Sequence, residues 1–339
     1  MLTIQSNVSL RPYNTFGIDV TARYLVEINS EDSLQTMLQL TDFQHLDKLI
    51  LGSGSNILFT QPFDGVIVKI DLKGIAITAE TDQNIWLKVA AGEAWHDLVI
   101  YCVSNNYAGL ENLSLIPGTV GAAPIQNIGA YGVELKDSFV SLEAIELATG
   151  QKHNFSHSDC RFGYRDSIFK HEAKGKFVIT SVVFKLDKTP TFRLSYGDIQ
   201  KTIDLMASKT LTIKAVSDAV IKIRRSKLPD PVEIGNAGSF FKNPEISTSQ
   251  FEPLKNRFEA IPSFSISPEI VKIPAGWLIE QCGWKGKQIG NVGVHAKQAL
   301  VLVNYGNGSG LEIKRLSERI QESVFEKFGI RLSTEVNIV

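Results

Sequence analysis

The sequence of 339 residues contains few cysteines, no long apolar run and no excess of charge of one sign, and each absence excludes a class of protein. Three widely spaced cysteines, Cys102, Cys160 and Cys282, do not suit a disulfide framework or a zinc site. The apolar runs are too short for a membrane-spanning helix. Because 35 lysines and arginines balance 36 aspartates and glutamates, the charge does not indicate binding to nucleic acid or to a membrane.

The histidines do not indicate a metal site, and the first residues do not indicate a secretory signal. His153 and His157 lie four residues apart, but no helical pattern and no third ligand supports a metal site, so we expect none. Residues 1–7 show neither the basic nor the apolar region of a secretory signal. Together with the sparse cysteine this predicts a cytoplasmic protein, which we also expect to be a monomer.

What is present is ordinary globular composition, with 43% hydrophobic and 21% charged residues. The length favours two or three domains. Changes of pattern predict a small α/β unit over residues 1–74, a strand-rich unit over 75–225 and a third unit over 226–328. Pro229-Asp230-Pro231 is a plausible hinge before the third unit, and a final strand over 330–339 closes the chain.

Periodicity predicts the individual elements. Apolar residues at helical spacing predict helices over 30–40, 95–103, 213–226 and 275–281, and a last helix with Leu316, Ile320, Val324 and Phe328 on one stripe, ended by Gly329. Alternating apolar residues predict strands over 48–51, 65–71, 85–90, 139–147, 177–186 and 299–304.

Two glycine-rich segments superficially suggest a dinucleotide fold. Gly306 to Gly310 follow the strand over 299–304, but the fingerprint needs a third glycine where Leu311 stands. The segment 51–56 fails the same test, because Ile57 occupies the last glycine position. A turn-rich loop explains residues 306–310 better than a Rossmann fold does.

Residues 51–56, Leu-Gly-Ser-Gly-Ser-Asn, still suit an anion. Gly52 and Gly54 allow the main chain to turn consecutive N–H groups towards one point, and Ser53, Ser55 and Asn56 add side-chain donors. Taken alone, a tight turn without a ligand explains them more simply.

A longer irregular segment, residues 109–132, carries glycines at five positions and prolines at 117 and 124, which exclude a regular helix or strand. Its many leucines, isoleucines and valines predict burial. Buried irregular main chain needs hydrogen-bond partners, and a flat ligand with polar edges such as a flavin would supply them. A loop satisfied by water and its own side chains is the alternative.

Three single residues are candidates for a chemical role, each with a structural alternative. Arg165 stands in an aromatic, glycine-containing segment, where a guanidinium can grip a carboxylate, although a structural arginine fits as well. Ser239 lies between a glycine and two phenylalanines and lacks the serine-hydrolase pattern. Glu335 belongs to a short alternating strand, where an acid is usually exposed.

Six segments occur together in an order that resembles the UDP-N-acetylenolpyruvoylglucosamine reductases, specifically the longer of two subtypes. The resemblance covers essentially the whole chain, from Arg11 to the segment of Glu335. The six segments are Asn14–Gly17, Leu51–Asn56, Ile116–Gly132, Cys160–Lys170, Lys227–Pro231 and Asn236–Pro244.

The resemblance implies a multi-domain α+β fold. Two α/β units of the vanillyl-alcohol-oxidase (PCMH) type, residues 1–74 plus about 329–339 and residues 75–225, would hold FAD non-covalently. An α/β domain over 226–328 would carry the UDP-sugar. The C-terminal strand would return to the first domain and bring Glu335 to the flavin.

The resemblance also implies the reaction. NADPH reduces the flavin and leaves, and UDP-N-acetylglucosamine enolpyruvate then takes the same site. Hydride from reduced flavin goes to the terminal enolpyruvyl carbon, which gives UDP-N-acetylmuramate for peptidoglycan synthesis. Arg165 and Glu335 would stabilise the developing enolate, and Ser239 would protonate it.

Matching the motifs residue by residue implies two further sets of contacts. The residues that would contact FAD are Gly52, Ser53, Gly54, Ser55, Asn56, Ile116, Pro117, Gly118, Gly121, Ala122, Ala123, Gln126, Asn127, Gly129, Ala130, Tyr131 and, less securely, Arg224. The residues that would bind substrate are Tyr196, Lys227, Asn243 and Gln298. Two departures are Ala122-Ala123, where relatives often have serines, and Asn337, where relatives often have arginine.

Two other interpretations stay open. Another FAD enzyme of the same superfamily, acting on a hydroxy acid or a sugar, would react with oxygen and need no uridine nucleotide. A nucleotide-binding regulatory protein that kept the fold without chemistry would have lost at least one of Arg165, Ser239 and Glu335, yet all three are present.

Overall fold

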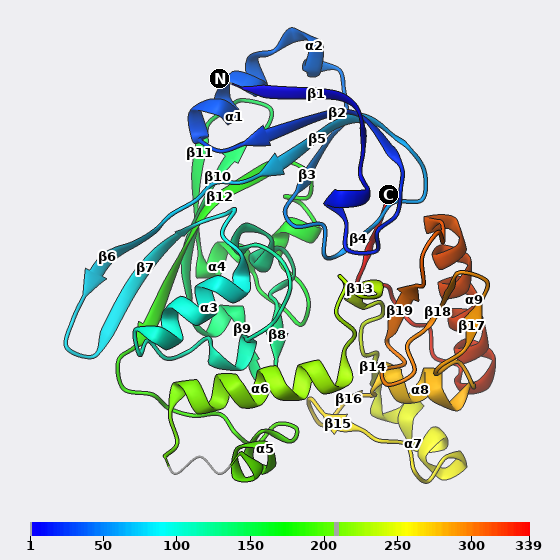
Figure 1. Ribbon diagram of the computed structural model, residues 1–339. Helices are drawn as coiled ribbons and strands as arrows, with labels where there is room; N and C mark the ends of the chain where they lie inside the picture. The colour runs from blue at the N-terminus through cyan, green and yellow to red at the C-terminus, as the bar shows by residue number, and fades with distance from the viewer. Residues whose placement is uncertain (1, 207–209) are drawn as a thin grey trace. The chain divides into compact units, whose positions relative to one another are not determined.

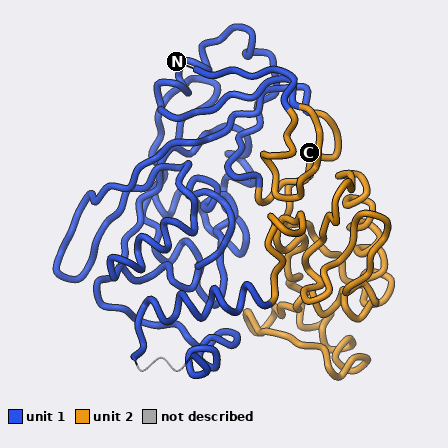
Figure 2. The backbone as a smooth tube through the Cα atoms, viewed as in Figure 1, with its two compact units in different colours: residues 1–8, 22–54, 63–226 blue, residues 9–21, 55–62, 227–339 orange. Residues whose placement is uncertain are grey.

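The computed structural model describes residues 2–206 and 210–339 (Figure 1). The chain divides into two compact units (Figure 2). Unit 1 comprises Met1–Val8, Ala22–Gly54 and Phe63–Ser226, and unit 2 comprises Ser9–Thr21, Ser55–Pro62 and Lys227–Val339. The finer division into three domains stays a prediction.

Unit 1 begins with a four-stranded sheet in the order β1-β2-β5-β3. Its strands are β1 (Thr3–Ser9), β2 (Thr21–Ile28), β5 (Phe63–Ile70) and β3 (Lys48–Leu51). β5 pairs in parallel with both β2 and β3. Its residues Val66, Ile67 and Val68 are fully buried, as expected for a central parallel strand covered on both faces.

Helix α1 (Glu31–Gln39) covers part of this sheet, and α2 (Thr41–Gln44) follows it. Ser30 begins α1, because its side chain and that of Ser33 cap each other's main-chain N–H groups. Leu34 and Met37 then pack into one core with Val26 and Val68.

A second sheet of unit 1 is antiparallel and runs in the order β11-β10-β12-β7-β6. Its strands are β11 (Lys152–Ser156), β10 (Phe139–Glu146), β12 (Phe177–Asp187), β7 (Asn84–Ala90) and β6 (Ile75–Glu80). Helix α3 (Trp95–Ser104) packs on it through Trp95, whose ring meets Phe184 edge-on at 5.9 Å.

The remaining elements of unit 1 are short, apart from one helix. The long irregular segment contains η2 (Glu111–Leu113), η3 (Val120–Gln126), β8 (Gly129–Ala130), β9 (Val133–Glu134) and η4 (Leu135–Asp137). It is followed by α4 (His157–Cys160), η5 (Ile168–Lys170), α5 (Ile199–Leu205) and α6 (Ile213–Lys227). Helices α5 and α6 share a small core that includes Ile199, Val216 and Val220.

Unit 2 is built on an antiparallel sheet in the order β13-β19-β18-β17. Its strands are β13 (Gly235–Ser239), β19 (Val301–Asn304), β18 (Val292–Val294) and β17 (Gln288–Ile289). A smaller sheet contains β14 (Glu245–Ser247), β16 (Ile270–Lys272) and β15 (Phe264–Ser265). The helices are η1 (Arg11–Tyr13), α7 (Thr248–Arg257), α8 (Ala275–Gln281) and α9 (Gly310–Phe328).

The first of the six segments, Asn14–Gly17, is structural within unit 2. The buried Asn14 side chain donates to the carbonyls of Leu10 and Ile18 and accepts from the N–H of Ile18. The carbonyl of Phe16 in turn accepts from the side chain of Asn304 on β19, at 2.9 Å. The segment therefore fixes a turn against the sheet.

Helix α9 ends at Gly329 as predicted. Ser309 and Glu312 form a capping box at its start, and Gly329 ends it with φ of 67°. Because its neighbouring strand β19 belongs to an antiparallel sheet, the Gly306–Gly310 loop is a turn before a helix, and the rejection of a Rossmann unit is confirmed.

The predicted strand over 330–339 was wrong in extent, since only β20 (Asn337–Ile338) is a strand. The segment changes partner along its length. Residues 333–335 bond to residues 240–242, whereas β20 pairs in parallel with β4 (Ile57–Leu58). This last pairing joins the chain end to residues 57–58, which belong to the same unit 2, and the return of the C-terminal strand to a first domain over residues 1–74 stays a prediction.

All three cysteines are free thiols. Within residues 2–206 and 210–339, no helix combines the length and apolar character that crossing a bilayer requires.

We predict that Gly310→Ala destabilises unit 2 by about 3 kcal/mol, because the added methyl would overlap the carbonyl oxygen of Phe59. Denaturant unfolding measures the change. Gly163→Ala makes the same chemical change where the methyl would meet only the Cβ of Asp166, at 3.4 Å, and should shift stability by less than about 0.5 kcal/mol. Equal effects of the two substitutions would contradict the close approach.

Candidate functional site

Within unit 1, the glycine loop that begins at Leu51 lies directly against the irregular glycine-rich segment of residues 109–132. A Cβ at Gly52 would stand 2.5 Å from Oγ1 of Thr119, so only glycine allows the two segments to approach this closely. Gly54 has φ of 68° and Gly118 has φ of 131°, conformations that glycine adopts without strain. Two segments that lie far apart in the sequence therefore form one surface of small residues and main chain.

Main-chain bonds hold this second motif in place. Trp95 donates to the carbonyl of Gly118 at 3.0 Å, and Gly121 donates to the carbonyl of Ala91 at 2.9 Å. A Cβ at Gly121 would stand 2.5 Å from that of Ala91. Packing against Ala91, the residue after β7, therefore requires this glycine, whether or not a ligand is bound.

The chain itself supplies many partners for the irregular segment. Arg165 donates through Nη2 to the carbonyl of Gly129 at 2.6 Å, Ser167 donates to that of Ile125 at 2.7 Å, and Asn112 donates to that of Tyr131 at 3.0 Å. The alternative of a loop satisfied by side chains of the protein therefore accounts for part of this main chain. Side chains of neighbouring segments satisfy a good part of it.

Asn127 has a structural role at the centre of the motif. It is fully buried, and its φ of 43° lies in the left-handed region, which asparagine tolerates. Its amide donates to the carbonyl of Gly163 at 3.0 Å and to Glu134, and its oxygen accepts from the N–H of Lys136 at 3.0 Å. Its contact with the cofactor stays a prediction.

Tyr196 lies beside the end of the same motif, in unit 1. A Cβ at Gly132 would stand 3.4 Å from the Cβ of Tyr196, and one at Gly197 would stand 3.6 Å from the ring of Tyr131. Tyr196 is 50% exposed, which suits a residue on a surface loop. Burial raises the pKa of Tyr131, so this hydroxyl stays protonated at neutral pH.

In unit 2, Ser239 and Glu335 lie on adjacent strand segments. The N–H of Glu335 donates to the carbonyl of Phe240 at 2.8 Å, Thr334 forms a bridge with Phe241, and Lys242 donates to the carbonyl of Ser333 at 2.9 Å. Ser239 is the neighbour of Phe240 in the chain. The side chains of Ser239 and Glu335 are both partly exposed.

Asn56 joins this pair within unit 2. Its amide donates to the carbonyl of Glu335 at 3.2 Å. Asn337 donates to the carbonyl of Asn56 with both its main-chain N–H, at 3.1 Å, and its side-chain amide, at 3.0 Å. Three motifs from distant parts of the sequence therefore meet, and Asn337 serves this junction with hydrogen bonds in place of a charge.

Two of the four predicted substrate residues meet at the first turn of α8. Oδ1 of Asn243 accepts from the N–H of Ala275 at 2.9 Å. Oε1 of Gln298 would stand 3.2 Å from a Cβ at Gly276 and accepts from the N–H of Leu300. Lys227, the last residue of α6, is exposed.

Arg165 belongs to unit 1, whereas Ser239 and Glu335 belong to unit 2. All three side chains are partly exposed, and Arg165 has φ of 51° and stacks its guanidinium near the ring of Tyr164. That the three share one cleft stays a prediction.

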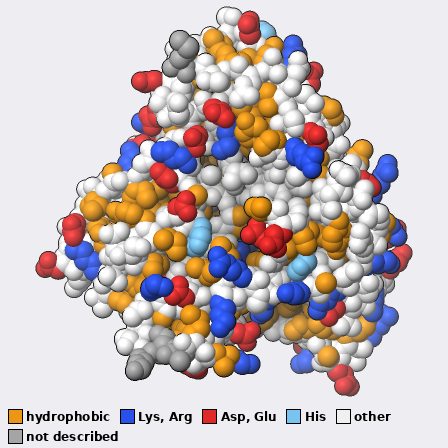
Figure 3. Space-filling model, in the orientation of Figure 1, with side chains coloured by type: hydrophobic (Ala, Val, Ile, Leu, Met, Phe, Trp, Pro, Cys, Tyr) orange, Lys and Arg blue, Asp and Glu red, His pale blue; other side chains and the backbone are white. Residues whose placement is uncertain are grey.

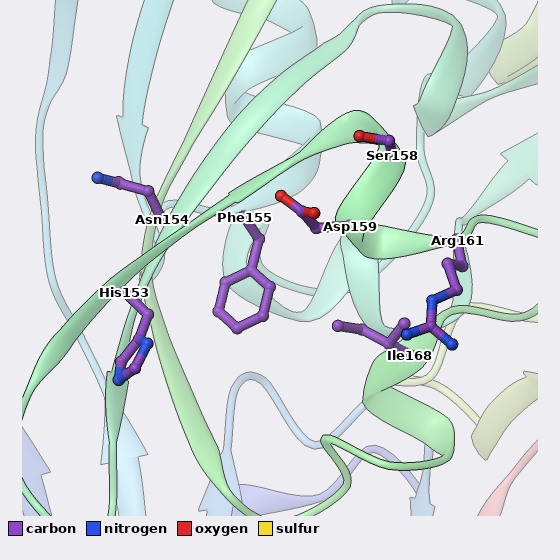
Figure 4. Close-up of a pocket in the computed structure, with 7 residues that line it drawn as sticks. All are labelled: His153, Asn154, Phe155, Ser158, Asp159, Arg161 and Ile168. Atoms are coloured by element: carbon purple, nitrogen blue, oxygen red, sulfur yellow. The ribbon is translucent and has the colours of Figure 1, made fainter.

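A pocket of about 400 Å³ lies elsewhere in unit 1, between β11, α4 and η5 (Figure 4). Its charged groups are engaged, because Arg161 pairs with Glu172 at 2.6 Å and Asp159 caps α4 by binding Ser156. None of the predicted site residues lines it.

Metal and thiol chemistry find no support in the part of the chain that the structure describes. No group of three or more histidine, cysteine or acidic side chains is placed to bind a metal ion among those residues. Burial raises the pKa of Cys102 and of Cys160 to about 12, so both thiols stay protonated and unreactive at neutral pH.

The glycine surface of unit 1 fits a dinucleotide cofactor. The turn after β3 and the segment from Gly118 to Ala123 present main chain and small side chains, which permit close approach of a pyrophosphate or a flat ring. A pyrophosphate would accept from main-chain N–H groups and from the hydroxyl of Ser53.

The sequence comparisons define the class. Residues 22–156, which include both glycine motifs, match the FAD binding domain family. The protein is therefore an FAD-binding protein of mixed α+β fold. Residues 230–339, most of unit 2, match the family described as UDP-N-acetylenolpyruvoylglucosamine reductase, C-terminal domain.

Full-length relatives are more specific. The UDP-N-acetylenolpyruvoylglucosamine reductase of Flavobacterium johnsoniae is 50% identical over 339 residues, with all of both chains covered. Those of Amoebophilus asiaticus and Pseudomonas putida are 51% and 45% identical, covering all and 98% of this chain and the same shares of the relatives. The chain belongs to the UDP-N-acetylenolpyruvoylglucosamine reductase family.

The fold agrees with this assignment. The crystal structure of UDP-N-acetylenolpyruvylglucosamine reductase from Thermus caldophilus superposes with a TM-score of 0.70. The match covers 100% of this chain and 99% of that chain, at 21% identity.

Sequence reasoning missed several residues that build the site. Asn112, Ser167 and His96 bind main chain of the irregular segment. Arg224, which was predicted as a cofactor contact, binds the carbonyl of Leu115 in the same segment. A buried polar residue beside an irregular segment has no periodicity to reveal it. The position of His96 in the first turn of α3 was the only available signal.

We predict that Asn127→Ala lowers the free energy of unfolding by about 3 kcal/mol more than Asn106→Ala does. The first change removes three hydrogen bonds in a buried site and leaves the N–H of Lys136 without its partner. Asn106 is exposed but also has a left-handed φ, of 58°, so the cost of alanine in that conformation is common to both variants. Equal destabilisation in denaturant unfolding would contradict the structural role of Asn127.

Proposed function

We propose that the chain reduces UDP-N-acetylglucosamine enolpyruvate to UDP-N-acetylmuramate, with non-covalent FAD as cofactor and NADPH as co-substrate, in the synthesis of peptidoglycan precursors. The names of its full-length relatives and the FAD binding domain support the activity. The main structural support is a set of hydrogen bonds in unit 2. Asn56 donates to the carbonyl of Glu335, and the N–H of Glu335 donates to Phe240, the residue after Ser239.

The proposed cofactor site is the glycine surface. Main-chain N–H groups of Gly52–Gly54 would bind the pyrophosphate, and the small residues of Gly118–Ala123 would lie against the ring. The N–H groups of Val120, Gly121 and Ala122 donate to carbonyls of the protein itself, so this part of the surface would contribute close packing. When bound, FAD accepts hydride from NADPH and passes it to the double bond of the substrate. The closely packed walls exclude water from the reacting atoms.

Hydride addition to the terminal enolpyruvyl carbon places negative charge on the neighbouring carbon and its carboxylate. In the proposed site, Arg165 binds this carboxylate as the charge develops. Fixed donors aimed at a charge that appears only in the transition state lower the barrier. The bond of Arg165 to the carbonyl of Gly129 supports the assignment, because it holds the guanidinium in one orientation.

Ser239 is the proposed general acid. A serine hydroxyl is a weak acid in water, but the enolate is strongly basic and takes the proton when it is held within hydrogen-bond reach. Glu335, on the adjacent strand segment, is proposed to act with Arg165 in stabilising the enolate. The strand pairing that places Glu335 beside Phe240 supports joint action of Glu335 and Ser239.

Tyr196, Lys227, Asn243 and Gln298 are proposed to bind the substrate. Lys227 offers an exposed cation for the diphosphate, and Asn243 and Gln298 offer amides at the first turn of α8. Tyr196 offers an exposed ring on a surface loop.

We further propose a cytoplasmic monomer without nucleic-acid or membrane partners. The balanced composition supports this proposal. On the face drawn in Figure 3, basic and acidic side chains are interspersed and do not form a field of one sign.

The rival function is that of an FAD-dependent oxidase or dehydrogenase of the same superfamily acting on a hydroxy acid or a sugar. Such an enzyme would need no proton donor at Ser239 and no uridine nucleotide. The two functions differ in whether oxygen or the enolpyruvyl substrate takes electrons from the reduced protein.

We predict that Ser239→Ala leaves reduction of the flavin by NADPH intact but slows oxidation by the enolpyruvyl substrate by roughly two to four orders of magnitude, the usual range for a general acid. Anaerobic stopped-flow spectroscopy measures the two half-reactions separately. Ser239→Cys should keep more activity than alanine, because a thiol can donate a proton.

Ser265→Ala is the matched control, since Ser265 is exposed on β15 of the same unit. It should leave both half-reactions unchanged. Equal damage to the two half-reactions in Ser239→Ala would refute the role of Ser239 as the acid.

A further inference from the structure

Leu115 holds an unfavourable conformation directly before the proposed cofactor residues Ile116, Pro117 and Gly118. Its φ is 58°, in the left-handed region of main-chain conformations that residues other than glycine, asparagine and aspartate rarely adopt. Such a conformation persists only where the surroundings enforce it. The residue after it precedes a proline and is restricted to extended conformations, so the geometry at Leu115 sets the direction of the whole segment.

Helix α3 binds the N–H side of Leu115. The N–H of Leu115 donates to Nδ1 of His96 at 2.9 Å. The preceding residue, Trp95, donates through its main chain to the carbonyl of Gly118 at 3.0 Å and through its indole to the carbonyl of Leu113 at 3.0 Å. The first turn of α3 therefore fixes the segment both before and after Leu115.

Helix α6 binds the carbonyl side. Nε of Arg224 donates to the carbonyl of Leu115 at 3.2 Å. One residue earlier, the hydroxyl of Ser114 lies 2.8 Å from that of Ser217, also on α6, and both serines are buried. The N–H and the carbonyl of Leu115 are thus held from two different helices of the same unit.

We infer that His96 is a positioning residue for the cofactor: as a neutral imidazole it accepts the N–H of Leu115, and together with Arg224 it holds the left-handed turn that presents Ile116, Pro117 and Gly118 to FAD. The inference rests on the proposed function only in naming FAD as the ligand. His96 itself contacts neither cofactor nor substrate in this role.

The bond requires one protonation state. Nδ1 can accept from Leu115 only when the ring is neutral and its proton is on Nε2. Protonation of His96 would place an N–H group opposite the N–H of Leu115 and break the bond. Acidification should therefore release the turn and weaken FAD binding.

The groups around His96 favour the neutral form. Burial, the largest effect, lowers the pKa of His96 below its usual 6.5, and Arg225 and Arg224 on α6 lower it further, whereas Asp97 on α3 raises it. Because the pKa in the folded protein lies below that of the unfolded chain, the bond contributes fully above pH 6.5. Its contribution is lost as the pH falls from 6.5 through the lowered pKa.

The test compares wild-type full-length protein with His96→Leu and His96→Asn. The asparagine oxygen can take the place of Nδ1 as an acceptor but does not titrate, whereas leucine offers no acceptor. The dissociation constant of FAD is measured by titration of flavin-free protein at neutral and at mildly acidic pH. At neutral pH we expect His96→Leu to bind FAD about tenfold more weakly than wild type, and His96→Asn to bind nearly as well as wild type.

The pH profile is the decisive readout. Wild type should lose FAD affinity on acidification by about tenfold more than His96→Asn does. Equal pH dependence of the two proteins, or equally weak binding by the asparagine and leucine variants at neutral pH, would overturn the inference. If the His96 imidazole served only to fill space, asparagine would not restore FAD affinity and also remove its pH dependence.

Hydrogen exchange of the Leu115 amide in the flavin-free protein separates this inference from the proposed function. Relative to intrinsic exchange, its protection should fall on acidification in wild type but not in His96→Asn. If wild type bound no FAD, the proposed function would fail, and this protection would still decide the role of His96. Unchanged protection in wild type at acidic pH would overturn that role, even if His96→Leu did not fold.

Discussion

The candidate site in unit 2 depends on the hydrogen bonds of the last seven residues. Residues 333–335 bond to the strand that follows Ser239, and residues 337–339 bond to the segment from Asn56 to Thr60. This change of partner shortens the terminal strand but places Glu335 at the junction of the two pairings. Without it, Glu335 and Asn56 would have no reason to meet, and Ser239 would stand alone on its strand.

In unit 1, side chains take the place of strand pairing as hydrogen-bond partners of the main chain. The segment from Gly109 to Gly132 contains only short 3-10 helices and the two-residue strand β8, so most of its main-chain groups need individual partners. Asn112, Arg165 and Ser167 supply several of them, and Asn127 ties the segment to Gly163 and Lys136. A segment fixed in this way can keep its conformation before a ligand arrives, which reduces the cost of ordering on binding. Arg165 links this structural role to its proposed chemical one, because one guanidinium can serve both the carbonyl of Gly129 and a substrate carboxylate.

The sequence predicted the bounds of several helices and strands well, but it did not predict which residues contact one another in the irregular parts of the site. Helix α8 and strand β3 have the predicted bounds, because apolar periodicity reports which face is buried. The C-terminal end of α9 was predicted from Gly329, whose role is local. The terminal strand was overextended, because alternation shows that residues are extended but not which partner each one has. His96 was overlooked, because its partner is a main-chain group nineteen residues later in the chain, and no pattern within one element reveals such a contact.

Electron flow from NADPH through bound FAD to the enolpyruvyl sugar nucleotide is the central claim. The most direct test is an anaerobic stopped-flow experiment that follows the visible absorbance of the flavin-loaded protein. The account predicts that NADPH bleaches this absorbance and that the enolpyruvyl substrate, added afterwards without oxygen, restores it with formation of UDP-N-acetylmuramate. Bleached protein that recovers its colour with oxygen but not with the enolpyruvyl substrate would contradict the account.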